Sequence, residues 1–327
     1  MIALLHWISL VFLPAFSSGA DKSLMQFVQT TPDSALIDFD FDPFIQTSNP
    51  TCAIPFTRAG NLMLVKAKAD NTEGNFILDT GAPGLVLNIT YFRDYPHSGA
   101  HEAEQSGITG TGGPAIKTQV KKFNLGSFDY AKIEADMANL GHIENSKGIK
   151  VLGLIGLEFF KQCEMIIDYE KNLIYLHHIS KKESNVYQHA MLNNTNEYRS
   201  IPIDIMDNRI VTTTEVAGKK LKVIIDCAAE TNILNSKLPN SVFETVTISR
   251  KVKLAGSGAK KIDALYGDLK EMRIGDYNIN NLPILITNLE GTCFSYNGCI
   301  DGVLGFDFLS LHKIGFNFVK RKMYIWK

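Results

Sequence analysis

The stretch Phe76-Ile-Leu-Asp79-Thr-Gly-Ala82 ends an apolar run on an aspartate, and Val223-Ile-Ile-Asp226-Cys-Ala-Ala229 does the same. The two aspartates lie 147 positions apart in the chain (79 to 226). A buried aspartate at a strand end is costly unless it is paired or used, and the small residues that follow let the backbone approach closely. These two stretches therefore decide which fold and function the remaining sequence must fit.

The similarity between the two halves of the chain extends beyond these stretches. Ile54-Pro55 corresponds to Ile201-Pro202 at the same shift of 147 (54 to 201). Gly153–Phe160 corresponds to Gly302–Leu309 at a shift of 149 (153 to 302). Because order and spacing are kept with so little drift, we interpret the sequence as an internal duplication.

Composition and patterning predict an all-β protein. Aromatic and β-branched residues are plentiful and turn residues recur at short intervals, which favours many short strands over long helices. Hairpins are expected where Leu62–Ala69 meets Asn75–Leu78 and where Arg209–Val216 meets Leu221–Ile225. Two further hairpins are expected at Met165–Asp168 with Leu173–Leu176 and at Ile314–Phe318 with Lys322–Trp326, and short helices at Gly156–Gln162 and Gly305–Leu311.

The N-terminus predicts export, to the periplasm or the medium. Met1–Phe16 is nearly all apolar and small residues follow it, as in a signal peptide, although no Lys or Arg precedes the run. A short membrane anchor is the alternative, but the run is shorter than the about 20 residues that a span needs. The predicted segments are a signal peptide (1–20), an N-terminal arm or propeptide (21–50), a first lobe (51–184), a linker (185–197) and a second lobe (198–327).

The charge balance argues against several kinds of partner. The formal net charge is -1 at pH 7, so nucleic acids and anionic membrane surfaces are poor candidates. After the predicted signal peptide, no stretch is long and apolar enough to cross a bilayer. No Cys/His cluster has zinc-ligand spacing, and we expect neither a metal nor an organic cofactor.

The five cysteines suit an exported protein without fixing a disulfide pattern. Cys293 and Cys299 flank a short loop with an Asn-Gly turn, and they are the pair that we expect to close. Cys52 and Cys163 could also pair, which the sequence leaves open. Cys227 would then be the odd thiol.

Together, Asp79-Thr80-Gly81-Ala82, the apolar-Gly runs Leu154-Ile155-Gly156 and Val303-Leu304-Gly305, and the duplication resemble the retropepsin-like and pepsin-like aspartic peptidases. The resemblance covers the chain from Ile54 to Trp326. It implies two homologous β-barrel-like lobes and a central cleft, where two aspartates share a proton. It also implies peptide-bond hydrolysis, in which one carboxylate activates water and the other protonates the carbonyl oxygen.

The resemblance implies roles for individual residues. Asp79 and Asp226 would form the catalytic dyad, and the Thr80 hydroxyl would bond to the opposite lobe. A glycine-rich hairpin at residues 107–113 would be a flap over an extended polypeptide, with an ordinary glycine-rich turn as the alternative; its weaker counterpart would be at residues 255–258. The other implied site residues are Gly81, Ala82, Cys227 and Ala228 in the turns, Ile155, Gly156, Leu304 and Gly305 in the apolar-Gly strands, and Gly107, Gly110, Gly112 and Gly113 in the flap.

The second aspartate turn departs from the family pattern. Cys227 stands in place of Thr, and because a thiol is a weak donor we expect a weakened interlock. Ala228 stands in place of Gly and adds a Cβ where the backbone should approach substrate. Glu230 adds a third acid near the site if it points inward.

Three functions are compatible with this sequence. In the first, Asp79 and Asp226 form an intact dyad in a slow or selective aspartic endopeptidase, which acts as a monomer. In the second, the second lobe is degenerate and the chain is a non-catalytic peptide- or glycan-binding protein. In the third, two copies associate through their first lobes and use two Asp79 residues. Otherwise, both aspartates are ordinary strand-end or turn acids.

Overall fold

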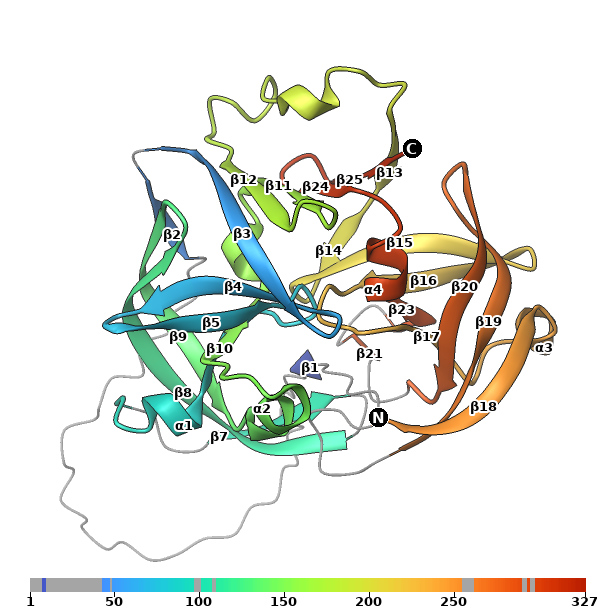
Figure 1. The fold of residues 1–327 in the computed structure, drawn as a ribbon, viewed down its shortest axis with the longest axis horizontal. Coiled ribbons are helices and arrows are strands. Elements are labelled where there is room, and N and C mark those ends of the chain that lie inside the picture. The colour runs from blue at the N-terminus through green and yellow to red at the C-terminus, as the bar shows by residue number, and fades with distance from the viewer. Residues whose placement is uncertain are drawn as a thin grey trace, which may run out of the picture.

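The fold of this protein is all-β, as predicted. Figure 1 shows the blue-to-green elements on one side of the molecule and the yellow-to-red elements on the other. Most of residues 1–50, and with them the predicted signal peptide and arm, lie outside the described part. The computed structural model describes residues 8–9, 43–47, 49–96, 101–107, 110–254, 262–289, 293–294 and 298–327.

The first half of the chain (residues 51–178) contains a closed β-barrel. Its strands pair in the order β8 (Gly110–Leu125), β9 (Phe128–Ala138), β6 (Leu85–Asn88), β10 (Gly153–Ile155), β5 (Thr72–Leu78) and β4 (Leu62–Ala69). Strand β8 also pairs with β4, which closes the ring. The short strand β10 lies parallel to β5 and antiparallel to β6, so the end of β5 is enclosed by the barrel.

The second half (residues 198–327) contains a ring with the corresponding order of pairing. It runs β19 (Ile262–Ile274), β20 (Tyr277–Thr287), β17 (Asn232–Asn235), β23 (Gly302–Leu304), β16 (Lys219–Ile225) and β15 (Arg209–Val216). A pairing between β15 and β19 closes it. Here β23 lies parallel to β16 and antiparallel to β17, so the end of β16 is enclosed in the same way.

An antiparallel sheet joins the two halves. Its order is β3 (Thr51–Ala59), β12 (Leu173–His178), β11 (Cys163–Asp168), β24 (Ile314–Asn317), β25 (Lys322–Trp326) and β13 (Tyr198–Pro202). At its centre, Met165 of β11 lies opposite Phe316 of β24. Figure 1 shows these strands between the two barrels and at one end of them. Neither half completes this sheet alone, because each supplies three of its strands.

Short elements complete the described fold. Strand β7 extends the first sheet beyond β8, β1 pairs with β7, β2 pairs with β9, and β14 and β18 flank the second ring. No helix in the described residues is long and apolar enough for a bilayer span. The bounds are β1 Ile8–Ser9, β2 Phe44–Gln46, β7 His101–Gly107, β14 Asp204–Met206, β18 Val246–Leu254, β21 Cys293–Phe294, β22 Gly298–Cys299, α1 Ile89–Phe92, α2 Gly141–Lys147, α3 Asn240–Phe243 and α4 Phe306–Leu309, with 3₁₀ helices η1 Leu157–Phe160 and η2 Ala190–Leu192.

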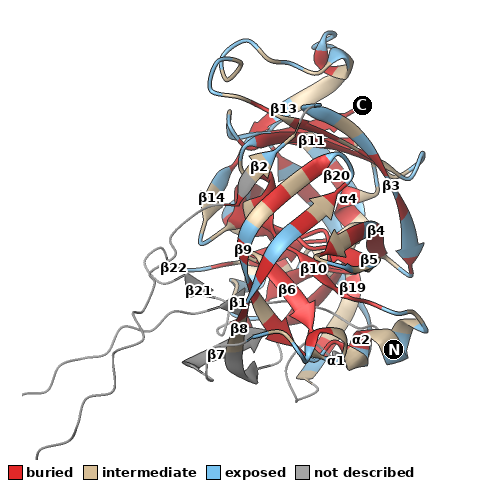
Figure 2. Cartoon of the chain, turned by 90° about the vertical axis from the view of Figure 1, so that its left-hand side faces the viewer, coloured by how far each residue is buried: buried red, intermediate tan, exposed pale blue. Residues whose placement is uncertain are grey.

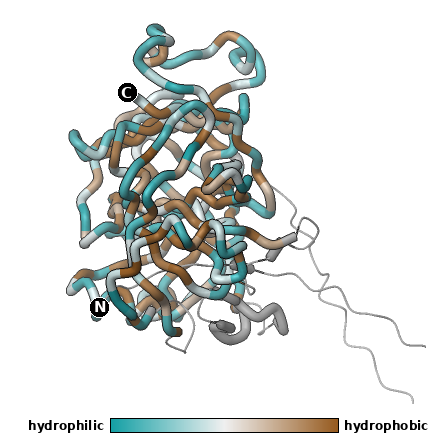
Figure 3. The backbone as a smooth tube through the Cα atoms, turned by 90° about the vertical axis from the view of Figure 1, so that its right-hand side faces the viewer, coloured by the Kyte–Doolittle hydropathy of each residue, from teal (hydrophilic) through white to brown (hydrophobic). Residues whose placement is uncertain are grey.

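Apolar side chains from both barrels and from the joining sheet form the main core. In the first barrel, Phe123 packs edge-to-face on Phe76 and Phe159, with ring centroids 5.3 and 5.2 Å apart. The buried Tyr130 hydroxyl donates a hydrogen bond to the Phe159 carbonyl at 3.1 Å. Along many strands buried and exposed residues alternate (Figure 2), and hydrophobic stretches gather inside the molecule (Figure 3). This is the arrangement that a period-two pattern produces on a half-buried sheet.

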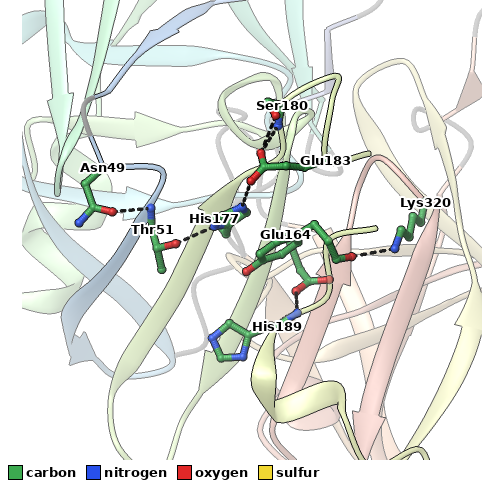
Figure 4. A network of polar contacts seen from close by, with 9 residues as sticks. Asn49, Thr51, Glu164, His177, Ser180, Glu183, His189 and Lys320 are labelled. Atoms are coloured by element: carbon green, nitrogen blue, oxygen red, sulfur yellow. Dashed lines mark hydrogen bonds and ion pairs between the residues drawn. The ribbon is translucent and has the colours of Figure 1, made fainter. Parts of the chain in front are cut away.

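Polar contacts tie the segment after β12 to the joining sheet (Figure 4). The His177 ring stacks on Tyr187 with centroids 3.6 Å apart. The His189 N–H donates to the Glu164 carboxylate at 3.2 Å, and the Lys320 ammonium donates to the Tyr187 carbonyl at 2.8 Å. The segment predicted as a linker therefore packs against both halves.

The predicted hairpins are confirmed, although several strands are longer than expected. Strand β5 begins at Thr72, β16 at Lys219 and β11 at Cys163, in each case two or three residues before the predicted start. The predicted helices are single short turns, Leu157–Phe160 and Phe306–Leu309, because the chain re-enters a strand soon after each turn.

The cysteines divide into one bonded pair and three free thiols. Cys299 is disulfide-bonded, and the register of β21 and β22 puts Cys293 directly opposite it. Cys52, Cys163 and Cys227 are free. The expected closure of the short loop is therefore supported, and the pairing of Cys52 with Cys163 that the sequence left open is not formed.

Candidate active site

Each candidate aspartate directly follows a central strand of its barrel, β5 or β16. The neighbouring parallel strand fixes its backbone. The Asp79 N–H donates to the Ile155 carbonyl, and the Asp226 N–H donates to the Leu304 carbonyl, both at 3.0 Å. The two apolar-Gly strands singled out from the sequence thus lie directly beside the two aspartate turns.

The glycines that end these strands are required by close backbone packing. A Cβ on Gly156 would lie 2.4 Å from the Gly84 carbonyl oxygen, and a Cβ on Gly305 would lie 2.4 Å from the Ala229 carbonyl oxygen. A side chain at either position would therefore displace the turn that follows an aspartate. This contact explains why each apolar run ends in glycine.

Each aspartate carboxylate is anchored by its own turn. Oδ1 of Asp79 accepts hydrogen bonds from the N–H groups two and three residues further on, at 2.9 and 3.0 Å. Oδ1 of Asp226 accepts the corresponding pair at 2.8 and 3.2 Å. One oxygen of each side chain is thus fixed by backbone donors, which pre-sets the orientation of both carboxyl groups.

The two aspartates meet at the contact between the halves. Both are completely buried, with 0% of their surface exposed, and the side chain of Asp226 lies close enough to Asp79 to act on its pKa. A Cβ on Gly81 would lie 2.4 Å from Oδ2 of Asp226, so only glycine fits there. Burial and then the charge of Asp226 raise the pKa of Asp79 well above its usual value, against the two backbone donors. Two buried carboxyl groups in contact share a proton.

Thr80 and Cys227 interlock the two turns. The Thr80 hydroxyl donates to the Ile225 carbonyl at 3.1 Å and accepts from the Cys227 N–H at 3.0 Å. The Cys227 thiol donates to the Leu78 carbonyl at 3.2 Å and accepts from the Thr80 N–H at 3.3 Å. The thiol thus makes both contacts that the hydroxyl makes on the other side.

Burial keeps the Cys227 thiol in its protonated form. Its pKa is raised by burial first, and then by the nearby charges of Asp226 and Asp79. A protonated thiol is able to donate the hydrogen bond to the opposite turn, whereas a thiolate is not. A nucleophilic role, which requires the thiolate, is disfavoured in this setting.

The other two departures in the second turn face the first half. Ala228 is completely buried, in an apolar cluster whose other members come from the first half. The Glu230 carboxylate forms an ion pair with Lys147 of α2, and the Asn61 amide donates to the Glu230 carbonyl at 2.9 Å. The third acid therefore binds a cation across the contact between the halves.

Two cations at the site, Lys147 and Arg209, were not singled out from the sequence. Arg209 is the first residue of β15 and only 2% exposed. It corresponds to Leu62 at the shift of 147. A charged residue at an apolar position of the repeat is the signal that could have revealed Arg209. No local sequence pattern distinguishes Lys147.

The glycine-rich segment predicted as a flap forms a hairpin of β7 and β8. Gly107 pairs with Gly110, and Gly112 and Gly113 lie in β8. Residues 108 and 109 at its tip, and the predicted counterpart at residues 255–258, lie outside the described residues. The hairpin is present on the backbone, and its role stays a prediction.

The described part of the chain contains no cluster of candidate metal ligands. Among those residues, no three His, Cys, Asp or Glu side chains gather in a way that could hold a metal ion.

A comparison with family models agrees with this geometry. Residues 212–308 match the model of a family described as aspartyl protease. This segment is an aspartic-peptidase-like domain. The matched range includes Asp226, so the aspartic-peptidase-like domain lies in the half whose turn reads Asp-Cys-Ala-Ala rather than Asp-Thr-Gly-Ala. No curated protein matches the chain.

Proposed function

We propose that this chain is an aspartic endopeptidase that hydrolyses peptide bonds with Asp79 and Asp226. The observation that carries the proposal is the contact between the two carboxyl groups, both buried and each held by its own turn. The match of residues 212–308 to aspartyl proteases supports the same class of reaction.

In the proposed reaction the dyad shares one proton. Asp79 holds it, because burial and the neighbouring carboxylate raise its pKa, and donates it to the carbonyl oxygen of the scissile amide. Asp226 takes a proton from a water, whose oxygen bonds to the carbonyl carbon to give a diol intermediate. That proton then passes to the leaving nitrogen as the C–N bond breaks, while a diol hydroxyl returns its proton to Asp79, which leaves a carboxylic acid and an amine. The rate should fall on the alkaline side as Asp79 loses its proton, and on the acidic side once the dyad holds two protons.

We also propose that the chain arose by internal duplication, with the lobe boundaries predicted from the sequence. Equivalent hydrogen bonds in the two halves support this. The Asn88 amide donates to the Val151 carbonyl at 2.9 Å, and the Asn235 amide donates to the Ile300 carbonyl at 3.3 Å. Because one chain supplies both aspartates, a monomer is sufficient for the proposed activity.

The proposed substrate is an extended polypeptide, lying between the dyad and the hairpin of β7 and β8 as an added strand. The proposed location is outside the cytoplasm, after removal of residues 1–20. The disulfide at Cys299 supports that location, because structural disulfides persist mainly in oxidising compartments.

Cleavage of a peptide library, measured from acidic to mildly alkaline pH, tests the proposal. Asp79→Asn and Asp226→Asn should each lower kcat/KM by roughly 10²–10⁴-fold, the usual contribution of an acid or base. Asp168→Asn is the matched control, because Asp168 is buried but structural: it accepts from the Lys171 N–H at 3.0 Å. Asn317 already occupies the corresponding position of the second half, so this control should keep its activity.

The outcomes separate the competing functions. Loss of cleavage in both dyad variants supports the proposal. Loss only in Asp79→Asn, together with a dimer in solution, supports a site built from two first halves. Peptide binding by the wild type without any cleavage supports a binding protein and overturns the peptidase.

A further inference from the structure

Arg209 has an unused hydrogen-bonding edge next to the dyad. The side chain is 2% exposed, and its Nε and Nη2 atoms have no hydrogen-bond partner among the described residues. These two nitrogens lie on the same edge of the planar guanidinium. A buried donor without an acceptor is costly, and the described residues supply no acceptor for this edge.

The strand register places Arg209 beside the second aspartate. In the pairing of β15 with β16, Ile210 lies opposite Ile225; continuing the register by one residue puts Arg209 opposite Asp226. Residues directly opposite in an antiparallel pair project to the same face of the sheet. Burial lowers the pKa of Arg209, while the negative charges of Asp207, Asp226 and Asp79 oppose that lowering, which places the guanidinium within the field of both dyad carboxyl groups.

The first half has a different residue at the same place. There Leu64 lies opposite Ile77, and continuing the register by two residues puts Leu62 opposite Asp79. Leu62 is completely buried and belongs to an apolar cluster. The two ends of the dyad therefore differ: the Asp79 side is apolar, and the Asp226 side carries a cation.

The repeat also accounts for the missing partner of Arg209. In the first half, the turn before β4 meets the carboxylate of Glu230: a Cβ on Gly60 would lie 3.1 Å from Glu230 Oε1. The residue that corresponds to Glu230 at the shift of 147 is Pro83. Proline offers neither a carboxylate nor an N–H group, so the repeat supplies no acid at the position that Glu230 takes in the first half.

We infer that Arg209 binds a carboxylate of the substrate, so that the enzyme prefers peptides with an acidic side chain, or a free C-terminus, near the scissile bond. The inference rests on the proposed peptidase function and names its substrate class. A guanidinium edge with two parallel N–H donors matches a carboxylate bidentately. Arg209 lies opposite Asp226 in the strand register, so a substrate that reaches the dyad lies beside the guanidinium.

Paired peptides test the inference. Otherwise identical peptides carrying Glu or Gln at each position around the cleavage site, with free or amidated C-termini, are compared at about pH 6, where a peptide carboxyl is ionised. The wild type should cleave the best Glu peptide, or its free-acid counterpart, at least about tenfold faster in kcat/KM than the neutral partner. Which of the two pairs shows the preference identifies the source of the carboxylate.

Three variants assign the preference to Arg209. Arg209→Met should reduce the charged-to-neutral ratio to about one, and Arg209→Lys should keep part of it, because an ammonium keeps the charge but loses the fork. Leu62→Met, the matched change beside Asp79, should keep the wild-type ratio. Circular dichroism checks the fold of each variant, and the wild-type ratio is decisive even where a variant does not fold.

The outcomes that overturn this inference differ from those that overturn the peptidase proposal. A wild type that cleaves charged and neutral peptides equally, or an Arg209→Met variant that keeps the ratio, overturns the inference and leaves the peptidase intact. A variant that only shifts the pH–rate profile shows that Arg209 acts on the dyad instead, which also overturns it. If the wild type cleaves no peptide, the peptidase proposal fails; the ratio is then read from peptide binding by fluorescence anisotropy, and equal binding overturns the inference too.

Discussion

At the scale of single residues, the Thr80–Cys227 pair is the device that holds the two aspartate turns together. The four contacts between Thr80, Cys227 and the carbonyls of Leu78 and Ile225 are all between 3.0 and 3.3 Å. Sulfur is a weaker donor and acceptor than oxygen, yet it has the right size and position. The expected weakening is therefore a matter of bond strength and not of lost contacts.

Substitutions at residue 227 should separate these two effects. Cys227→Ala leaves the Thr80 N–H and the Leu78 carbonyl without their buried partner, and should lower the free energy of unfolding by about 1–3 kcal/mol. Cys227→Thr restores a hydroxyl and should be at least as stable as the wild type. Urea denaturation measures both. An alanine variant as stable as the wild type would show that the thiol contributes nothing to the interlock.

At the scale of elements, strand β11 carries a buried acid in the middle of the joining sheet. Glu164 is 2% exposed; its carboxylate accepts from the Asn317 amide at 2.8 Å and from the His189 N–H at 3.2 Å. Burial raises the pKa of Glu164, and these donors and the charge of Lys320 oppose the rise. The Glu164 carboxylate thus binds the segment after β12 to the sheet, and the burial of its charge is unfavourable.

This cost predicts how stability depends on pH. When the folded-state pKa of an acid is raised, stability falls as the pH rises from the unfolded value, about 4.3 for Glu, through the raised value. Glu164→Gln removes that fall, so the variant should gain about 1.4 kcal/mol at neutral pH for each unit of the pKa rise, less any loss from weaker hydrogen bonds. The gain should vanish in acid. Thermal unfolding across the pH range measures it.

Glu183 provides a control of opposite sign in the same network (Figure 4). Hydrogen bonds from Ser180 lower the pKa of Glu183, so its contribution is present above the unfolded pKa and is lost as the pH falls through the lowered value. Glu183→Gln should therefore lose stability at neutral pH relative to acid. If the two Gln variants show the same pH trend, the assignment of opposite pKa shifts is wrong.

At the scale of the whole molecule, Asp79 and Asp226 come together only because the halves are held in register. The joining sheet provides most of the contacts that hold this register, with β11 paired to β24 across its centre. Closer to the site, the Lys147–Glu230 ion pair crosses between the halves with its side chains 14% and 6% exposed. Removing one member of such a well-buried pair is strongly unfavourable, because the remaining charge is left buried without a partner.

Breaking this pair should destabilise the whole molecule. Lys147→Met leaves Glu230 buried without its cation and should cost about 3–5 kcal/mol of unfolding free energy. The double variant Lys147→Met/Glu230→Gln should recover much of that loss, which a double-mutant cycle in urea measures. Lys253→Met breaks an exposed pair, whose side chains are 68% and 78% exposed, and should cost at most about 1 kcal/mol. A cost at Lys147 no larger than at Lys253 would contradict the role of the buried pair.

The sequence by itself determined the strands and the two aspartate turns. Strand β4 and strand β15 have the bounds predicted from the sequence, because strand and turn signals depend only on near neighbours in the chain. Gly156 and Gly305 were also singled out, as the ends of two apolar runs that resemble the family motif. These features are local, because each depends only on nearby residues in its own half of the chain.

Only the tertiary structure decided what the two turns do to each other. The contact of Asp79 with Asp226, the bonds of the Cys227 thiol and the turning of Glu230 toward Lys147 join residues far apart in sequence. The sequence marks Arg209 only as a charge where the repeat has Leu62, and the fold shows its buried, unused edge. Such contacts depend on how two barrels pack, which no local pattern encodes, and they set the protonation and the partners of the candidate site.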